Sequence, residues 1–129
     1  HPGGSLGRKL LTKVSDVMKK DSLPILKPDM PFDEIISVIS NGRLGLGIVL
    51  EGDKVKSVIT DGDIRRLLKT EKEKALSFKA SEFGSHNPLS ISSKEKLVAA
   101  EQMMQEKKVT AILVIDNDEL KGIIHRYDI

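Results

Sequence analysis

The stretch that decides the fold is VKSVITDGDIRRLL, which spans Val55–Leu68. Its first five residues form a largely apolar, β-branched run that is typical of a strand. Turn and capping residues follow at Thr60–Asp63, and apolar residues then recur at helical spacing from Ile64 onward. The stretch therefore predicts a strand that runs directly into a helix, with Thr60 or Asp61 as the N-cap.

The predicted helix N-terminus is a candidate anion site. Unpaired N–H groups and the positive end of the helix dipole attract anions there. Arg65 and Arg66 lie one turn inside the helix, where their guanidinium groups could clamp a phosphate or a carboxylate. An ordinary capped helix with solvated arginines is the alternative that this stretch alone leaves open.

A second copy of the pattern stands near the C-terminus, at Leu120–Ile129. Asp63 aligns with Asp128, an offset of 128 − 63 = 65 residues. The same offset pairs Lys56 with Lys121, and no gap is needed over roughly forty residues. The chain therefore contains an internal repeat.

Each copy predicts the same order of elements. In the first copy we expect a capped turn at 15–18, a short extended segment at 24–26, a helix at 32–39, strands at 45–50 and 55–59 around a turn at 51–53, and a helix from 61 to about 69. In the second copy we expect a turn at 80–83, an extended segment at 88–91, a helix at 94–105, strands at 111–115 and 120–124 around a turn at 116–118, and a helix beginning at 126 or 127. A further short helix is expected at 6–11.

Two helical stripes define the expected core. The first helix should bury Phe32, Ile35, Ile36 and Ile39, which follow the i, i+3, i+4, i+7 spacing of one apolar face. The second helix should turn Leu97, Ala100, Met103 and Met104 inward, with the methionines filling gaps in the core.

Composition narrows the classes of function. The 129 residues carry a net charge of +2, and their aromatic fraction of 3% offers no platform for stacking bases, so nucleic-acid binding is not expected. The chain has no cysteine and no apolar run long enough for a membrane span, and we expect a soluble cytoplasmic protein. The histidines His1, His86 and His125 show no ligand spacing, so no metal site or cofactor is expected.

The repeated plan resembles the CBS domain pair, also called a Bateman module. The resemblance covers about Val14 to Ile129 and rests on the strand–[Ser/Thr]-x-x-Asp–helix ending of each copy. It implies an α/β (α+β) fold of two tandem β-α-β-β-α units related by pseudo-two-fold symmetry. The implied boundaries are a junction at 1–13, a first unit at 14–69, a linker at 70–79, which its charge predicts to be solvated, and a second unit at 80–129 whose closing helix is truncated.

The resemblance also implies where a nucleotide would bind. In the family the hydroxyl of the motif caps the helix near a phosphate, and the aspartate accepts hydrogen bonds from ribose hydroxyls. The implied ligand-binding residues are Gly45, Leu46, Gly47, Thr60, Asp61, Gly62, Asp63, Arg65, Arg66, Thr110, Ala111, His125, Arg126 and Asp128, and Val109 is implied to line the same pocket. His125 replaces the hydroxyl residue in the second copy, where it could either donate to an anion or simply pack. The glycines at 45 and 47 either admit a ligand close to the backbone or relieve crowding between strand and helix.

The first eleven residues, HPGGSLGRKLL, resemble the junction after the sugar isomerase (SIS) domain of arabinose 5-phosphate isomerases. Such enzymes serve 3-deoxy-manno-octulosonate (Kdo) and lipopolysaccharide biosynthesis and carry a CBS pair. The resemblance implies a catalytic role for His1 in the full-length enzyme only, and no enzymatic activity for the fragment. We expect a piece of a longer protein with an upstream SIS domain, which would be a homodimer through its CBS units and a tetramer in full length.

Two functions remain open at this point. The first is regulation, with CMP-Kdo as the economical feedback ligand and AMP or ATP as the default for the family. The second is a module that stabilises the isomerase assembly without sensing a ligand. The sequence leaves open the identity of the ligand, whether one or both copies bind it, and the sign of its effect.

Overall fold

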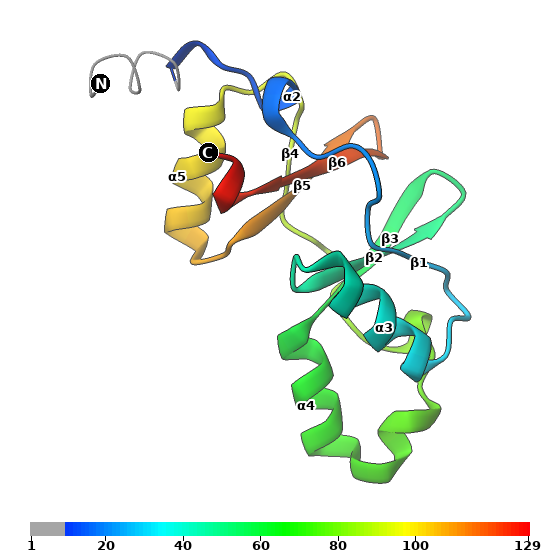
Figure 1. Ribbon diagram of the computed structural model, residues 1–129. Helices are drawn as coiled ribbons and strands as arrows, with labels where there is room; N and C mark the ends of the chain where they lie inside the picture. The colour runs from blue at the N-terminus through cyan, green and yellow to red at the C-terminus, as the bar shows by residue number, and fades with distance from the viewer. Residues whose placement is uncertain (1–9) are drawn as a thin grey trace. The chain divides into compact units, whose positions relative to one another are not determined.

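The computed structural model describes residues 10–129 and divides the chain into two compact units. The first-repeat unit comprises Ser22–Pro88, and the second-repeat unit comprises Leu89–Ile129 together with residues 10–21. The expectations for His1 and for most of the helix at 6–11 lie outside the described residues. Each unit combines helices with a small sheet (Figure 1).

The first-repeat unit builds a three-stranded sheet in the order β1-β2-β3. Its elements are β1 (Ile25–Leu26), α3 (Phe32–Gly42), β2 (Leu46–Glu51), β3 (Lys54–Thr60), α4 (Asp61–Glu71), and the 3₁₀ turns Lys72–Ser77 and Ala80–Glu82. Strand β1 is parallel to β2, and β2 is antiparallel to β3. The predicted order of elements is confirmed, with boundaries that differ by a few residues.

Helix α3 covers a core formed by Leu26, Ile35, Ile39, Val49, Ile59 and Ala80. The expectation for Ile36 is wrong, because this side chain is 37% exposed while Val38 is partly buried against the core. The buried face of α3 is therefore centred on Ile35 and Ile39, and Ile36 lies at its solvent edge. The helix ends after Gly42, where Arg43 adopts a left-handed conformation with φ 58°.

The segment at 70–79 carries more structure than its charge suggests. Helix α4 runs on to Glu71, and a 3₁₀ helix then occupies Lys72–Ser77. Ala75 is fully buried and clusters with Phe32 and Leu67. Part of the expected solvated linker therefore packs onto the first-repeat unit, since one small apolar residue among charged neighbours suffices to anchor it.

The second-repeat unit builds its sheet in the order β4-β5-β6, with β4 parallel and β6 antiparallel to β5. Its elements are α2 (Val14–Val17), β4 (Ser90–Ile91), α5 (Leu97–Lys107), β5 (Ala111–Asp116), β6 (Glu119–His125) and the 3₁₀ turn Arg126–Asp128. Leu97, Ala100 and Met104 of α5 are buried, and Met103 packs against the same core. The predicted inward face of this helix is confirmed.

Each unit is completed by a short segment that precedes the other copy. Val14 is fully buried in the core of the second-repeat unit, and Ala80 is fully buried in the core of the first-repeat unit. Both segments begin with the same cap: Asp16 accepts from the Lys13 N–H at 2.9 Å, and Glu82 accepts from the Lys79 N–H at 2.7 Å. The two compact units are therefore not simple intervals of the sequence.

Strand register shows that the two copies are equivalent residue by residue. Val49 pairs with Ser57 as Val114 pairs with Gly122, and both ladders then shift by one residue. The shift leaves Lys56 and Lys121 as the extra residue of a bulge in the same position. Because the bulge interrupts both hairpins alike, the offset of 65 residues holds in three dimensions.

A group of hydrogen bonds around Asp116 is particular to the second-repeat unit. The Ser93 and Ser92 hydroxyls donate to the Asp116 carboxylate, and the Ser93 N–H donates to it at 3.1 Å. These hydrogen bonds, with the Ser93 hydroxyl first, hold the pKa of Asp116 below its usual value of 3.8. They fasten the end of β4 to the end of β5.

The hydrogen bonds to Asp116 lead to a pH-dependent prediction. A carboxylate with a lowered folded-state pKa stabilises the fold above its usual pKa, and the stabilisation is lost as the pH falls through the folded value. Asp116→Asn should lower the free energy of unfolding on the order of 1 kcal/mol at pH 7. The difference from the parent chain should shrink as the pH falls below 3.8. Urea unfolding of the variant and the parent chain at pH 7 and at a pH below 3.8 measures this difference in stability. An equal difference at the two pH values would show that the charge of Asp116 does not contribute to it.

Candidate functional site: two equivalent strand–helix turns

The turn between β3 and α4 is a closed capping box. The Thr60 hydroxyl accepts from the Asp63 N–H at 3.1 Å, and the Asp63 carboxylate accepts from the Thr60 N–H at 2.9 Å. Thr60 is therefore the N-cap, as predicted, and Asp61 is the first helical residue. The box fixes the direction of the first turn of α4.

The start of β2 lies beside this turn, as the implied site requires. Leu46 pairs with Thr60 across the ladder, and the Asp61 N–H donates to the Gly45 carbonyl at 3.1 Å. Gly45 has φ +73°, and a Cβ there would lie 3.4 Å from the Asp61 carboxylate. The backbone conformation at position 45 therefore requires glycine, and the absence of a side chain there keeps the space above the turn open.

Gly47 serves packing. A Cβ at this position would lie 2.7 Å from Cδ1 of Leu26 and 3.0 Å from Cγ1 of Ile39. Both neighbours are buried in the core. Of the two alternatives for this glycine, the geometry favours relief of crowding between β1 and α3.

The two arginines differ in what they contact. Arg66 folds back toward the turn, where its Nη2 donates to the Asp63 Oδ1 at 2.6 Å. A Cβ on Gly62 would lie 3.2 Å from Arg66 Nη1, so the absent side chain makes room for the guanidinium. The Arg66 side chain is still 70% exposed. Arg65 is exposed on the same helix, so the turn presents carboxylates and movable cations together.

The second-repeat unit repeats this arrangement with different side chains. The Arg126 N–H donates to the Thr110 carbonyl at 2.8 Å, which matches the bond between Asp61 and Gly45, and Ala111 pairs with His125. The His125 Nδ1 accepts from the Tyr127 N–H at 3.1 Å, and the His125 N–H donates to Asp128 at 3.0 Å. His125 is buried and caps the turn as Thr60 does.

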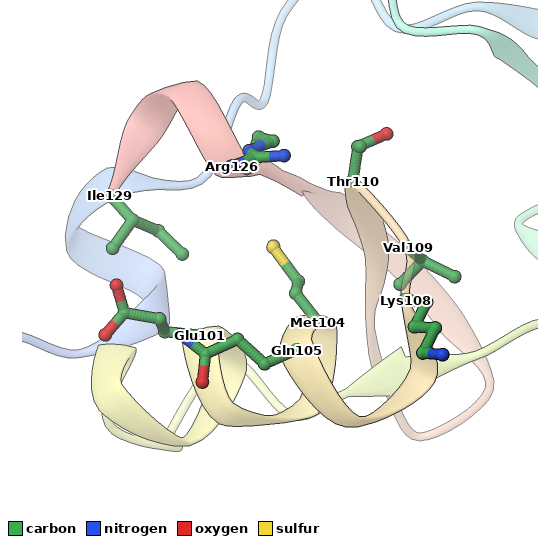
Figure 2. A pocket seen from close by; sticks show the side chains of 8 residues that line it. All are labelled: Glu101, Met104, Gln105, Lys108, Val109, Thr110, Arg126 and Ile129. Carbon is green, nitrogen blue, oxygen red and sulfur yellow. The ribbon is translucent and has the colours of Figure 1, made fainter.

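A cavity of about 420 Å³ opens beside this second turn. Figure 2 shows its lining side chains, with Met104 near the middle, Ile129 to its left, Arg126 above it and Thr110 to its upper right. The full lining comprises Glu101, Met104, Gln105, Lys108, Val109, Thr110, Arg126 and Ile129. Its size suits a small organic ligand, and its lining includes two cations, one carboxylate, a hydroxyl and apolar side chains.

The cavity adds residues to the expected set. Val109, Thr110 and Arg126 were expected, whereas Lys108 and Met104 were not assigned to a site. Lys108 ends α5 in a left-handed conformation, as Arg43 ends α3 in the first copy. The repeat offset could have indicated this residue, because it places a basic residue three positions before the start of the strand in both copies.

Among residues 10–129, no group of three or more His, Cys, Asp or Glu side chains is placed to hold a metal ion. Within the same residues, no helix has the length and apolar character needed to cross a bilayer.

A protein-family profile for the CBS domain matches the chain twice, at residues 14–70 and 80–129. The chain belongs to the CBS domain family. Solved structures agree on the fold: CBSX2 in complex with AMP matches with a TM-score of 0.79 and 21% identity over 91% of this chain and 92% of that one. A CBS domain protein from Pyrobaculum aerophilum, also complexed with AMP, matches with a TM-score of 0.75 and 19% identity over 90% and 88% of the two chains.

Curated relatives are named as arabinose 5-phosphate isomerases. A probable arabinose 5-phosphate isomerase of Haemophilus influenzae is 42% identical over 125 residues, which cover 96% of this chain and 37% of that protein. The isomerase KpsF of Escherichia coli is 37% identical over 131 residues, which cover 99% of this chain and 39% of that protein. The chain thus spans about two fifths of the length of these relatives.

Proposed function

We propose that this CBS pair is the nucleotide-responsive regulatory part of an arabinose 5-phosphate isomerase. The observation that carries the proposal is the pair of equivalent strand–helix turns, at Thr60–Asp63 and His125–Asp128, each bonded to the start of its neighbouring strand. Two CBS proteins of the same fold are complexed with AMP, and the relatives of this chain carry the isomerase name.

The chemistry of the turns suits a nucleotide. A nucleotide presents anionic phosphate together with ribose hydroxyl donors. Asp63 can accept from hydroxyls, since its Oδ1 is engaged only by the exposed Arg66. Arg66 can instead turn to a phosphate, because an exposed ion pair costs little to open. In the second-repeat unit, Arg126 and Lys108 face a cavity large enough for part of such a molecule.

Within the nucleotides, we propose CMP-Kdo as the ligand. A nucleotide sugar acid adds a carboxylate to the phosphate, and the arginines at 65, 66 and 126 supply matching charge. An end product that prefers one state of the pair would shift an attached isomerase toward its matching state by differential affinity. AMP or ATP remains the alternative, and we place the protein in the cytoplasm, where these ligands would be present.

A role in assembly is the second candidate, and exposed apolar side chains favour it. Ile36 on α3, Leu68 on α4 and Leu76 in the following 3₁₀ helix are each at least 37% exposed. Apolar side chains on the outside of helices suit contact with another protein chain. Homodimerisation through this unit, and a tetramer in the longer protein with its SIS domain, would use such a surface.

Thermal unfolding tests the proposed function. A ligand that binds only the folded state raises the melting midpoint by mass action. We expect CMP-Kdo to raise the midpoint more than CMP, AMP, ADP or ATP at equal concentration. If only the adenine nucleotides raise the melting midpoint, the proposal of feedback control by CMP-Kdo gives way to one in which the same turns sense cellular energy. If none of the five changes the midpoint, regulation by these nucleotides is contradicted and the assembly role is favoured.

A further inference from the structure

A second cavity, of about 180 Å³, lies in the first-repeat unit at the end of β2 far from the Thr60 turn. Leu46 at one end of β2 pairs with Thr60, whereas Glu51 at the other end lines the cavity. The lining comprises Pro28, Val49, Glu51, Lys56, Ser57, Ser81 and His86. None of these residues belongs to the turns described above.

Ser57 is the unusual member of this lining. It is only 1% exposed, and no hydrogen bond to its hydroxyl is present among the described residues. Its oxygen is not fully enclosed, since no wholly buried side-chain oxygen among those residues lacks a partner. The hydroxyl is therefore nearly buried and has no hydrogen-bond partner among the described residues, and Ser57 lines the cavity. A buried polar group without a partner costs free energy, and a ligand that bonds to it would recover that cost.

In the other copy a methionine side chain covers the position equivalent to Ser57. Gly122 is the equivalent of Ser57, because both pair with the matching valine of the preceding strand. A Cβ on Gly122 would lie 3.2 Å from Cγ and Sδ of Met18, so the Met18 side chain lies over this glycine. In the second-repeat unit, an unbranched thioether chain therefore occupies the position.

The first-repeat unit has lost that side chain. Lys19 bridges to Ile123 as Ser85 bridges to Val58, which makes Gly84 the equivalent of Met18. In the second-repeat unit, a hydrogen bond from Ser93 to Asp116 closes the same region. The first-repeat unit has Pro28 in place of Ser93 and Glu51 in place of Asp116, and it lacks this bond because proline has no side-chain donor. The cavity thus has Ser57 in its lining, whereas Met18 covers the equivalent Gly122 of the other copy.

The rim of the cavity carries opposite charges. Lys56, the bulged residue of β3, has its Nζ 3.7 Å from the Glu51 carboxylate, and their side chains are 54% and 67% exposed. Such a pair contributes little to stability and opens at low cost. His86 adds a further ring nitrogen at the rim. An ammonium group placed at Glu51 and a carboxylate placed at Lys56 would satisfy both charges together.

We propose that this cavity, which we name the Ser57 pocket, binds a free α-amino acid with an unbranched apolar or thioether side chain, such as methionine. The zwitterionic head takes the place of the Lys56–Glu51 ion pair. The side chain lies along Val49 and Pro28, where Met18 provides the internal precedent, and its sulfur accepts from the Ser57 hydroxyl. The pocket lies apart from the nucleotide turns and is independent of the proposed function.

Amide NMR with three matched probes tests the proposal. L-methionine should shift the amide signals of Ser57, Ser81 and His86. The acid that lacks its amino group and the amine that lacks its carboxylate should each bind about fivefold more weakly, which is the scale of one exposed charge pair. Equal binding of the acid alone would make this an anion site and overturn the proposal, as would the absence of any shift or shifts confined to other residues.

Two variants complete the experiment. Ser57→Met should fill the cavity from within and abolish the shifts, while the rest of the spectrum reports that the chain is folded. Lys56→Gln should weaken L-methionine binding about fivefold, whereas Lys121→Gln, the same change at the same bulge of the other copy, should leave it unchanged. Since Lys56 is an exposed residue, its variant tests the pocket even if Ser57→Met does not fold. Retained binding in Lys56→Gln would contradict the assignment of the charged rim.

Discussion

Gly122→Ala is expected to lower the free energy of unfolding of the second-repeat unit by about 2–3 kcal/mol, as overpacking of a filled core does. The added Cβ would lie 2.5 Å from the Lys19 carbonyl oxygen, which is backbone and cannot rotate away. Lys19 is also held to Ile123 by two hydrogen bonds, of 2.8 and 2.9 Å. The segment could retreat from the new methyl group only by losing these bonds or the packing of Met18.

Urea unfolding measures this effect, and the other copy provides the control. Ser57→Ala places the same alanine at the equivalent position, where no Met18-like side chain lies above it, so its effect on stability should be small. Equal losses of stability in the two variants would show that the close contact of Gly122 with the Lys19 segment does not govern this site.

Asp63→Ala is expected to have the second large effect, because one carboxylate serves both the fold and the proposed ligand. The variant loses the bond from the Thr60 N–H, which should cost about 1 kcal/mol of helix stability. It also loses the proposed acceptor for ribose hydroxyls, so nucleotide affinity should fall at least about tenfold, the value of a charged hydrogen bond. Isothermal titration with the nucleotide that raises the melting midpoint most measures this loss.

Asp33→Ala is the matched control for that variant. Asp33 also lies in the first turn of a helix of eleven residues, at the start of α3, but it belongs to neither turn of the candidate site. Its replacement should therefore leave nucleotide affinity unchanged. A loss of affinity as large as that of Asp63→Ala would assign the effect to net charge and not to the turn.

The repeat made most of the fold predictable from the sequence. Turn residues at Gly52–Asp53 and Asn117–Asp118, each between two largely apolar runs, indicated both hairpins. The cap at Thr60 was predictable because a hydroxyl residue stands three positions before an aspartate at the end of a strand. These signals are local in the sequence, and local rules of backbone geometry are sufficient to interpret them.

Features that depend on contacts between distant segments were not predictable. The burial of Val14 beside the second copy and of Ala80 beside the first follows from packing that neither periodicity nor composition encodes. The same holds for Ala75, which anchors a segment whose charge predicted solvent exposure. The Ser57 pocket requires a comparison of the two copies in three dimensions, since Met18 and Gly84 become equivalent only through their strand contacts.

The two strand–helix turns of the candidate site were predictable from the sequence, but the structural role of each residue in them was not. Gly47 faces the core, and His125 caps its turn through Nδ1, so each has a structural task besides any contact with ligand. Lys108 enters the lining of the cavity because α5 ends beside the start of β5. Side-chain direction decides these roles, and sequence spacing alone does not specify it.

The most direct measurement is an amide NMR titration of this chain with the nucleotide that raises its melting midpoint most. We expect shifts at 45–46 and 60–63 in one unit and at 110–111 and 125–126 in the other, with smaller changes elsewhere. These are the segments that the bonds from Asp61 to Gly45 and from Arg126 to Thr110 hold together. Binding that leaves both turns unperturbed, or that shifts residues of the Ser57 pocket in their place, would contradict the proposed nucleotide site.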